Sequence, residues 1–256
     1  MKKAILLVSV GSTHLEVLER TTGALVEKIR EAFPGQEVCQ AFSSPRILKM
    51  MQEKKPGEFQ SVREKLDELE KNGYTCVTMQ PAYVISGQEQ ENLREIWREY
   101  QEHFEKITLG KPLFAAKEDY INALEGILLE ASLEEGEALM LVGHGTNHHT
   151  NTEYQNLEYT AYVQGHRNVF VAALEGHQKL AILMRKLQIS GCKKVCLMPL
   201  LFAAGKHAQK DIGGSENSWK TRLEEAGYEV RVKLTGLGEM EQIQNIYLEH
   251  LTQMEP

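Results

Sequence analysis

The sequence lacks any apolar run long enough to cross a bilayer as a helix, which takes about 20 consecutive apolar residues. Met1-Lys2-Lys3 and the apolar run 4–10 superficially resemble a short secretion signal. The run is short, however, and it leads into Gly11-Ser12-Thr13-His14 without a small-residue cleavage site. We therefore interpret it as a first buried strand, and we expect a cytoplasmic protein that has no membrane partner.

An excess of positive charge is also missing. The chain has 29 Lys and Arg against 36 Asp and Glu, a net charge of −7, and it has no basic tract. Such a chain is a poor candidate for binding nucleic acid, so no nucleic-acid partner is expected. Aspartate is scarce, with only Asp67, Asp119 and Asp211, which weakens the case for magnesium-phosphate chemistry based on clustered aspartates.

Several common cofactor and nucleophile motifs are absent. The sequence has no Gly-x-Gly-x-x-Gly, no Walker lysine and no Gly-x-Ser-x-Gly elbow. Cysteine is limited to Cys39, Cys76, Cys192 and Cys196. The last two have a spacing that also suits a metal or redox pair, but the segment between them leads into an apolar run. We therefore interpret the cysteines as buried, reduced thiols.

What remains is the composition of an ordinary globular protein. The 256 residues are 42% hydrophobic and 25% charged, which is typical of soluble domains. A chain of this length can bury a substantial core without disulfides, as one large domain or two small ones.

Short β-branched runs alternate along the chain with longer helical patterns. The expected strands are 4–10, 37–42, 74–80, 107–109, 138–142, 168–174, 194–198 and 229–233. The expected helices are 14–33, 88–104, 119–132, 151–164, 177–188, 215–226 and 240–253, and helical material also follows the strand at 37–42 and continues to Asn72 with a break near Pro56-Gly57. Ser215 is the expected N-cap of the helix at 215–226, with Ser218 as the alternative. Alternation of this kind predicts an α/β fold with parallel sheets that helices cover on both faces.

The two halves of the sequence repeat one another. Residues 5–12 align with 139–146, and the strand that ends at Pro81 aligns with the strand that ends at Pro199. In both halves a glycine, Gly87 or Gly205, follows that proline six residues later. We therefore predict two similar α/β lobes, residues 1–115 and 116–256, with a final helix that can pack back on the first lobe.

The two halves have different residues at several matching positions just after their strands. The differing pairs are Val10 and His144, Ser44 and Glu175, and Glu89 and His207. The second half thus has His, Glu and His after three successive strands, where open α/β sheets bind their ligands. Two imidazoles and a carboxylate suit a divalent cation such as Co²⁺, Ni²⁺, Zn²⁺ or Fe²⁺ and leave coordination positions open.

The residues alone leave other interpretations open. His144 is also compatible with a helix cap or a phosphate contact, although Gly143 and Gly145 on either side would let a large ligand approach its backbone. A carboxylate at Glu175 also suits the N-terminus of the next helix. His207 is equally compatible with an ordinary helix position, and His148-His149 offers a second, local metal site.

Several stretches together resemble the anaerobic sirohydrochlorin cobaltochelatases, which belong to the class II chelatases. These stretches are 1–9, Gly143-His144-Gly145 with His148-His149, 198–201, 204–208, 218–220 and 236–239. The resemblance implies two α/β lobes with a cleft between them. It also implies an enzyme that inserts Co²⁺ into sirohydrochlorin, or its precorrin-2 precursor, in cobalamin biosynthesis, with no organic cofactor.

The resemblance implies that His144, Glu175 and His207 hold the metal. Because insertion removes two pyrrole protons, His144 is the expected main acceptor and His207 assists it. A metal-bound imidazole nitrogen cannot also take a proton, so these two roles must alternate. Glu89 would face the same cleft and contact the tetrapyrrole or take the second proton; its alternative is a solvated helix residue.

The tetrapyrrole is rich in carboxylates, so an acidic protein needs local basic residues to hold it. Lys206 and Arg46 are the expected carboxylate-binding residues, with Lys210 a further candidate. The other wall of the cleft is expected to consist of Val10, Gly11, Ser12, Tyr83 and Ser86.

Two alternatives stay open. One is a ferrochelatase or nickel chelatase that acts on a related tetrapyrrole, since the ligand set does not separate these metals. The other is a carrier of tetrapyrrole or metal without turnover. The sequence is compatible with a monomer or an oligomer.

Overall fold

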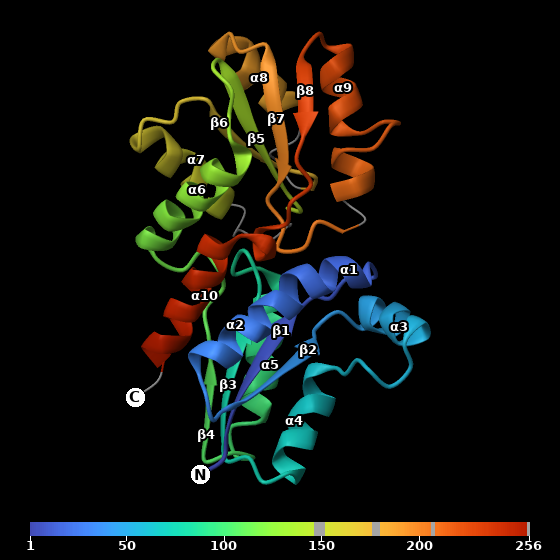
Figure 1. Ribbon diagram of the computed structural model, residues 1–256, viewed down its shortest axis with the longest axis vertical. Helices are drawn as coiled ribbons and strands as arrows, with labels where there is room; N and C mark the ends of the chain where they lie inside the picture. Colours follow the sequence, from blue (N-terminus) through green and yellow to red (C-terminus); the bar gives the residue numbers. More distant parts are fainter. Residues whose placement is uncertain (146–151, 176–179, 206–207, 255–256) are drawn as a thin grey trace. The chain divides into compact units, whose positions relative to one another are not determined.

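A computed structural model describes residues 1–145, 152–175, 180–205 and 208–254 (Figure 1). The chain divides into two compact units. The first contains Met1–Ala115 together with Gln244–Pro256, and the second contains Ala116–Ile243. Among the described residues, no helix is long and apolar enough to span a membrane.

The first unit is built on a four-stranded parallel sheet in the order β2-β1-β3-β4. Its strands are β1 (Lys3–Ser9), β2 (Glu37–Phe42), β3 (Cys76–Pro81) and β4 (Lys106–Leu109). Its helices are α1 (Leu15–Leu18), a π-helical turn η1 (Glu19–Gly23), α2 (Ala24–Ala32), α3 (Pro45–Lys54), α4 (Val62–Lys71) and α5 (Gln88–Glu99), joined by most of α10 (Glu241–Met254). Figure 1 shows helices on both sides of the sheet.

Central strand β1 is apolar along nearly its whole length because helices cover both faces of the sheet. Polar side chains define where the neighbouring helices begin. Ser44 accepts a hydrogen bond from the Ile47 backbone N–H at the start of α3, and Ser61 forms a capping box with Glu64 at the start of α4. The fully buried Tyr247 of α10 donates a hydrogen bond from its hydroxyl to the Tyr83 carbonyl at 3.0 Å, which ties the last helix to the first unit.

The second unit has the same topology, with strand order β6-β5-β7-β8 and all neighbours parallel. Its strands are β5 (Glu137–Gly143), β6 (Val169–Ala173), β7 (Lys194–Pro199) and β8 (Glu229–Val232). Its helices are α6 (Lys117–Ala131), α7 (Thr152–Val163), α8 (Leu180–Ser190), a π-helical turn η3 (Ala208–Ile212), α9 (Trp219–Glu225) and a short 3-10 turn η4 (Leu237–Glu239).

The strand registers match the internal repeat seen in the sequence. Val8 pairs with Pro81 in the first sheet, and Val142 pairs with Pro199 in the second. The predicted α/β class and the parallel sheets are therefore confirmed. Each expected strand is present. The central strands are continuous apolar runs, the local signature of strands that are buried on both faces, whereas the edge strands β4 and β8 are short and only partly buried.

Two expectations at helices need correction. The expected helix at 14–33 is interrupted by η1, where the hydrogen-bonding pattern changes to that of a π-helix. Ser215 is not the N-cap of α9: the buried Ser218 accepts the bond from the Thr221 backbone N–H at 3.1 Å. Ser218 also donates to the Gly214 carbonyl, a contact that only the folded loop supplies.

All four cysteines are free thiols. Burial raises the pKa of Cys39 to about 12 and that of Cys196 to about 11, so both stay protonated at neutral pH. This agrees with the interpretation of reduced, structural cysteines.

A buried ion pair connects two strands of the second unit through their side chains. Arg231 of β8 donates from Nε and Nη2 to the two carboxylate oxygens of Glu137 at 2.7 Å each, and Glu137 is 2% exposed. Burial opposes ionisation of Glu137, but the bonds from Arg231 and from the Glu134 backbone outweigh it, so the pKa of Glu137 lies below its ordinary value of 4.5.

Glu137→Gln should lower the free energy of unfolding by about 2 kcal/mol at pH 7, because it removes charge-assisted hydrogen bonds from a buried site. A lowered folded-state pKa adds stability above the unfolded-state pKa, and that stability is lost as the pH falls through the folded-state value. The difference from wild type should therefore shrink below about pH 4. Denaturant unfolding at a series of pH values measures it.

Glu134→Gln is the matched control, since Glu134 forms an exposed ion pair with Lys194 and should change stability by less than about 0.5 kcal/mol. Equal effects of the two substitutions, or a Glu137→Gln effect that does not vary with pH, would contradict the assignment.

Candidate metal and substrate site

The structure brings His144 and Glu175 together at the carboxyl ends of neighbouring strands. His144 follows β5 and Glu175 lies two residues after β6. The Glu175 backbone N–H donates to the His144 carbonyl at 2.9 Å, one step beyond the bond from Leu174 to Gly143 at 3.0 Å. Both side chains are exposed. An imidazole and a carboxylate, fixed at adjacent backbone positions and open to solvent, are suitable ligands for a divalent cation.

Gly145 makes this close approach possible. Its φ of +82° lies in the left-handed region, and a Cβ built there would lie 2.2 Å from the Glu175 carbonyl oxygen and 2.9 Å from the Ala173 Cβ. No side chain fits at this position without moving the segment that bears Glu175. The glycine after His144 is therefore required by packing within the site.

Tyr154 supports the same turn from α7. A Cβ at Gly143 would lie 2.6 Å from the Tyr154 ring, and the Tyr154 hydroxyl accepts a hydrogen bond from the Gly145 backbone N–H at 3.4 Å. Burial raises the pKa of Tyr154, although the bond from Gly145 acts in the opposite direction. Sequence reasoning did not single out this residue. Its only signal is its position on the buried face of α7, together with Leu157 and Ala161.

His207 and Lys206 lie outside the described residues, as do His148 and His149. Within the part of the chain that is described, no group of three or more His, Cys, Asp or Glu side chains is close enough to hold a metal. The structure therefore places two of the three expected ligands, His144 and Glu175, at one sheet edge.

The expected substrate-binding residues of the first unit lie at the carboxyl edge of its own sheet. Val10 follows β1 and is 38% exposed. Gly11 has a φ of +92°, and a Cβ there would lie 2.9 Å from the Met51 sulfur. Ser12 is buried, and its Oγ accepts a hydrogen bond from the His14 backbone N–H at 3.2 Å. This turn therefore offers an exposed apolar side chain beside a closely packed backbone.

The other candidates in the first unit come from three further segments. Arg46 is exposed in the first turn of α3, while Ser86 is half-buried in the loop before α5. Glu89, in the first turn of α5, accepts a hydrogen bond from the Ser43 hydroxyl at 2.9 Å. Tyr83 is 5% exposed, so its ring belongs mainly to the core and not to an open wall. Sequence reasoning missed Ser43 because an isolated serine at a strand end has no distinctive pattern.

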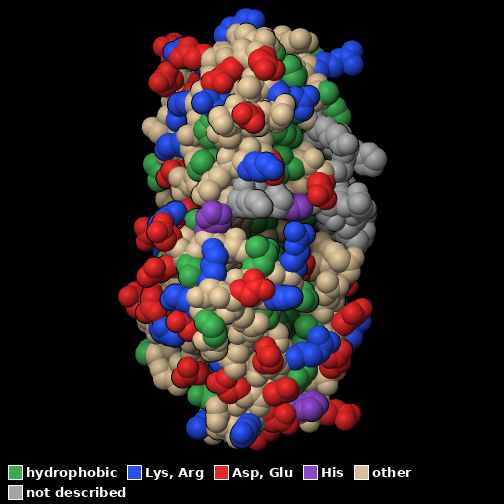
Figure 2. Space-filling view, turned by 90° about the vertical axis from the view of Figure 1, so that its right-hand side faces the viewer, with side chains coloured by type: hydrophobic (Ala, Val, Ile, Leu, Met, Phe, Trp, Pro, Cys, Tyr) green, Lys and Arg blue, Asp and Glu red, His purple; other side chains and the backbone are tan. Residues whose placement is uncertain are grey.

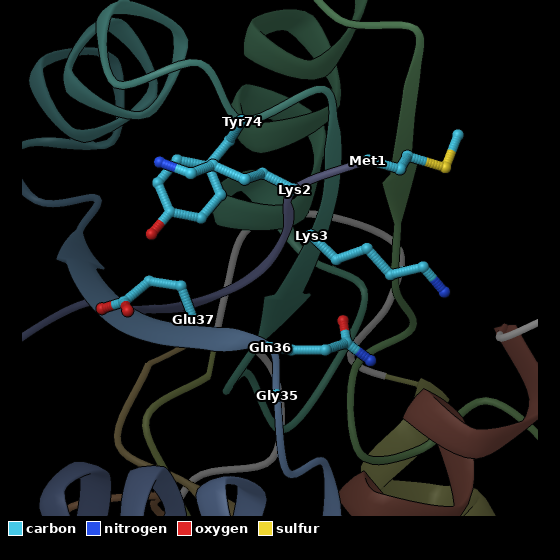
Figure 3. Close-up of a pocket in the computed structure, with 7 residues that line it drawn as sticks. All are labelled: Met1, Lys2, Lys3, Gly35, Gln36, Glu37 and Tyr74. Atoms are coloured by element: carbon cyan, nitrogen blue, oxygen red, sulfur yellow. The ribbon is translucent and has the colours of Figure 1, made fainter.

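A hollow of about 500 Å³ lies at the opposite, amino edge of the first sheet (Figure 3). Its lining residues are Met1, Lys2, Lys3, Gly35, Gln36, Glu37 and Tyr74. The Lys2 ammonium lies 5.1 Å from the centroid of the Tyr74 ring and donates to the Asn72 carbonyl. Parallel sheets bind ligands beyond the carboxyl ends of their strands, so this hollow is separate from the candidate site.

The sequence matches a family model described as cobalt chelatase (CbiK) over residues 3–255. The chain belongs to this family. It is 30% identical over 255 residues to a sirohydrochlorin cobaltochelatase of Salmonella typhimurium, a match that covers 99% of this chain and 96% of the relative. It is 34% identical over 258 residues to the sirohydrochlorin cobaltochelatase CbiKC of Nitratidesulfovibrio vulgaris, covering 98% and 90% of the two chains. The expected resemblance to cobaltochelatases is thus confirmed.

Solved structures of other chelatases share the fold of this family member. SirB from Bacillus subtilis, solved with Fe³⁺, aligns with a TM-score of 0.72 at 16% identity, covering 99% of this chain and 95% of SirB. CbiX, described as the terminal enzyme of sirohaem biosynthesis in denitrifying bacteria, aligns with a TM-score of 0.61 at 16% identity, covering 99% and 100% of the two chains. These alignments confirm the chelatase-like fold of two parallel sheets flanked by helices that the sequence predicts.

Gly145→Ala should destabilise the protein considerably more than Gly165→Ala. Both glycines have positive φ, but a Cβ at Gly165 meets nothing within 4 Å, whereas one at Gly145 collides with the Glu175 backbone. The control should cost about 1 kcal/mol for the backbone conformation alone. Gly145→Ala should cost at least about 1 kcal/mol more, since the neighbouring segment must shift. Denaturant unfolding of the two variants measures the difference, and equal losses would contradict the contact.

Proposed function

We propose that this chain inserts Co²⁺ into sirohydrochlorin, with His144 as a metal ligand and proton acceptor. The observation that carries the proposal is the family match over residues 3–255, combined with His144 and Glu175 at adjacent strand ends. The names of the two relatives supply the substrate. The acidic chain and the exposed His-Glu pair agree with the capture of a cation from solution.

The mechanism follows from what insertion requires. Two pyrrole N–H bonds must break, and each nitrogen keeps its electron pair for the incoming Co²⁺. His144, with His207 as the assisting base, accepts a proton when its imidazole is not bound to the metal, because histidine exchanges protons near neutral pH. The Glu175 carboxylate neutralises part of the charge of the cation and orients it. Metal binding and proton acceptance by His144 therefore alternate as Co²⁺ passes to the ring.

The expected substrate-binding residues hold the tetrapyrrole in this proposal. Val10, Gly11 and Ser12 supply apolar contact and backbone donors, and Ser86 contributes from the loop that follows β3, where the buried Tyr83 ring supports the backbone. Arg46 and Lys206 hold carboxylates of the substrate through charge-assisted hydrogen bonds. Glu89 contacts the ring or takes the second proton. No organic cofactor takes part.

His144→Ala should lower the rate of Co²⁺ insertion by about 100-fold or more, because it removes a metal ligand and an acid-base group together. Glu175→Gln, which keeps size and removes charge, should show a smaller loss in the same direction. The measurement is the anaerobic loss of the free-base absorbance of sirohydrochlorin after Co²⁺ is added. A reaction without protein corrects for unaided insertion.

His166→Ala is the matched histidine control, since His166 is exposed in the loop before β6, at the amino edge of the sheet. Its rate should equal that of wild type. A wild-type rate no faster than the reaction without protein would refute cobalt insertion, and the same assay with Ni²⁺ and Fe²⁺ would then test the other metals. A fully active His144→Ala variant would refute the assigned site.

Arg46→Ala and Lys206→Ala should each raise the KM for sirohydrochlorin about fivefold or more, while turnover stays within about twofold. The reason is that each substitution removes one charge-assisted contact that the substrate makes equally in the ground state and the transition state. Lys49→Ala, an exposed cation on the same helix as Arg46, is the control and should leave KM unchanged. An unchanged KM in both test variants would argue against these carboxylate contacts.

A further inference from the structure

The two sheets end in different side chains at equivalent backbone positions. The Ser43 N–H donates to the Ser9 carbonyl at 2.8 Å, and the Leu174 N–H makes the corresponding bond to Gly143 at 3.0 Å. Ser43 of the first unit thus corresponds to Leu174 of the second. A polar residue therefore stands in the first unit where the second has an apolar one.

The same comparison applies after the third strand of each sheet. The Tyr83 carbonyl accepts from the Leu113 N–H at 2.8 Å, and the Leu201 carbonyl accepts from the Leu237 N–H at 2.8 Å. Tyr83 thus corresponds to Leu201. The first unit has hydroxyl groups at both positions, and the second has leucine at both.

The hydroxyl of Ser43 is directed at Glu89. It donates to Glu89 Oε2 at 2.9 Å, a contact that joins residues 46 positions apart in the chain. Both ends of the bond are held by regular structure: the Ser43 backbone continues the ladder of β2, and Glu89 lies in the first turn of α5. One carboxylate oxygen is therefore fixed, and Oε1 stays as the second acceptor.

Tyr83 lies beside Ser43 and Glu89, but its phenol cannot act as a proton acceptor there. Its side chain is buried, and burial is the main cause that raises its pKa, while the Ser43 hydroxyl opposes this effect and the negative charge of Glu89 adds to it. The phenol is therefore neutral at physiological pH and cannot act as a base. Glu89 is the group of this set that can accept a proton.

We propose that Ser43 is a positioning residue that holds Glu89 so that Oε1 accepts the second pyrrole proton during metal insertion. This inference rests on the proposed function. In the step, the pyrrole N–H bond breaks, the nitrogen keeps the electron pair for Co²⁺, and an O–H bond forms at Glu89 Oε1. The carboxylic acid then loses its proton to water.

The test is a double-mutant cycle on Co²⁺ insertion at saturating sirohydrochlorin. Glu89→Gln should lower kcat by about 100-fold. Ser43→Ala should lower kcat about tenfold with KM nearly unchanged, the loss expected for one hydrogen bond to a charged group. Because Ser43 acts only through Glu89, the double variant should be no slower than Glu89→Gln alone. Ser43→Thr, which keeps the hydroxyl, should restore kcat to within about threefold of wild type.

Two controls separate this role from a general structural one. Glu95→Gln changes an exposed glutamate on the same helix. Ser190→Ala removes a hydroxyl that donates to the Leu187 carbonyl at the end of α8 in the second unit. Neither should alter kcat. A fully multiplicative loss in the double variant, or an unchanged kcat in Ser43→Ala, would overturn the inference while the proposed function stands. A wild-type protein that inserts no metal would overturn both.

Discussion

The parallel pairing of β5 with β6 is the constraint on which the candidate metal site depends. In a parallel sheet all strands end at the same edge, so the residues that follow them are brought together whatever their separation in the chain. Here the ladder continues beyond the strands: Leu174 bonds to Gly143 and Glu175 bonds to His144. Two residues 31 positions apart in sequence thereby become backbone neighbours, and Gly145 is the residue that allows the close approach.

The second unit repeats the fold of the first with the same strand order, yet the two edges have diverged in chemistry. The second edge has an imidazole and a carboxylate, both exposed, which suit a metal that must be bound and then released. The first edge has a carboxylate held by a serine hydroxyl beside a buried phenol. Because each sheet needs only a few substitutions at its edge, duplication of a fold lets the two edges acquire different side-chain chemistry. On the face of the molecule shown in Figure 2, acidic and basic side chains are interspersed and do not form large patches of one charge.

One interaction that stabilises the second unit lies away from the candidate site. Glu137 begins β5 and Glu175 follows β6, so the buried ion pair with Arg231 lies at the amino edge of the sheet and the candidate ligands at the carboxyl edge. The exposed side chains of His144 and Glu175 take no part in this buried ion pair. Substitutions at His144 and Glu175 should therefore change chemistry more than folding.

The sequence by itself determined the strands, the duplicated α/β architecture and the family. Continuous apolar runs predict strands that are buried on both faces. The motifs that are typical of the family can be read in a single sequence. It also indicated His144, Glu175 and Glu89 as candidate site residues, because residues that break a repeat are visible without coordinates. Only the tertiary structure decided that Tyr154 supports the turn around His144, that Ser43 holds Glu89, that Arg231 neutralises Glu137, and that Ser218 and not Ser215 caps α9. Each of these contacts joins a side chain to a group on another element or in a folded loop, and such contacts depend on packing geometry that local residue patterns do not encode.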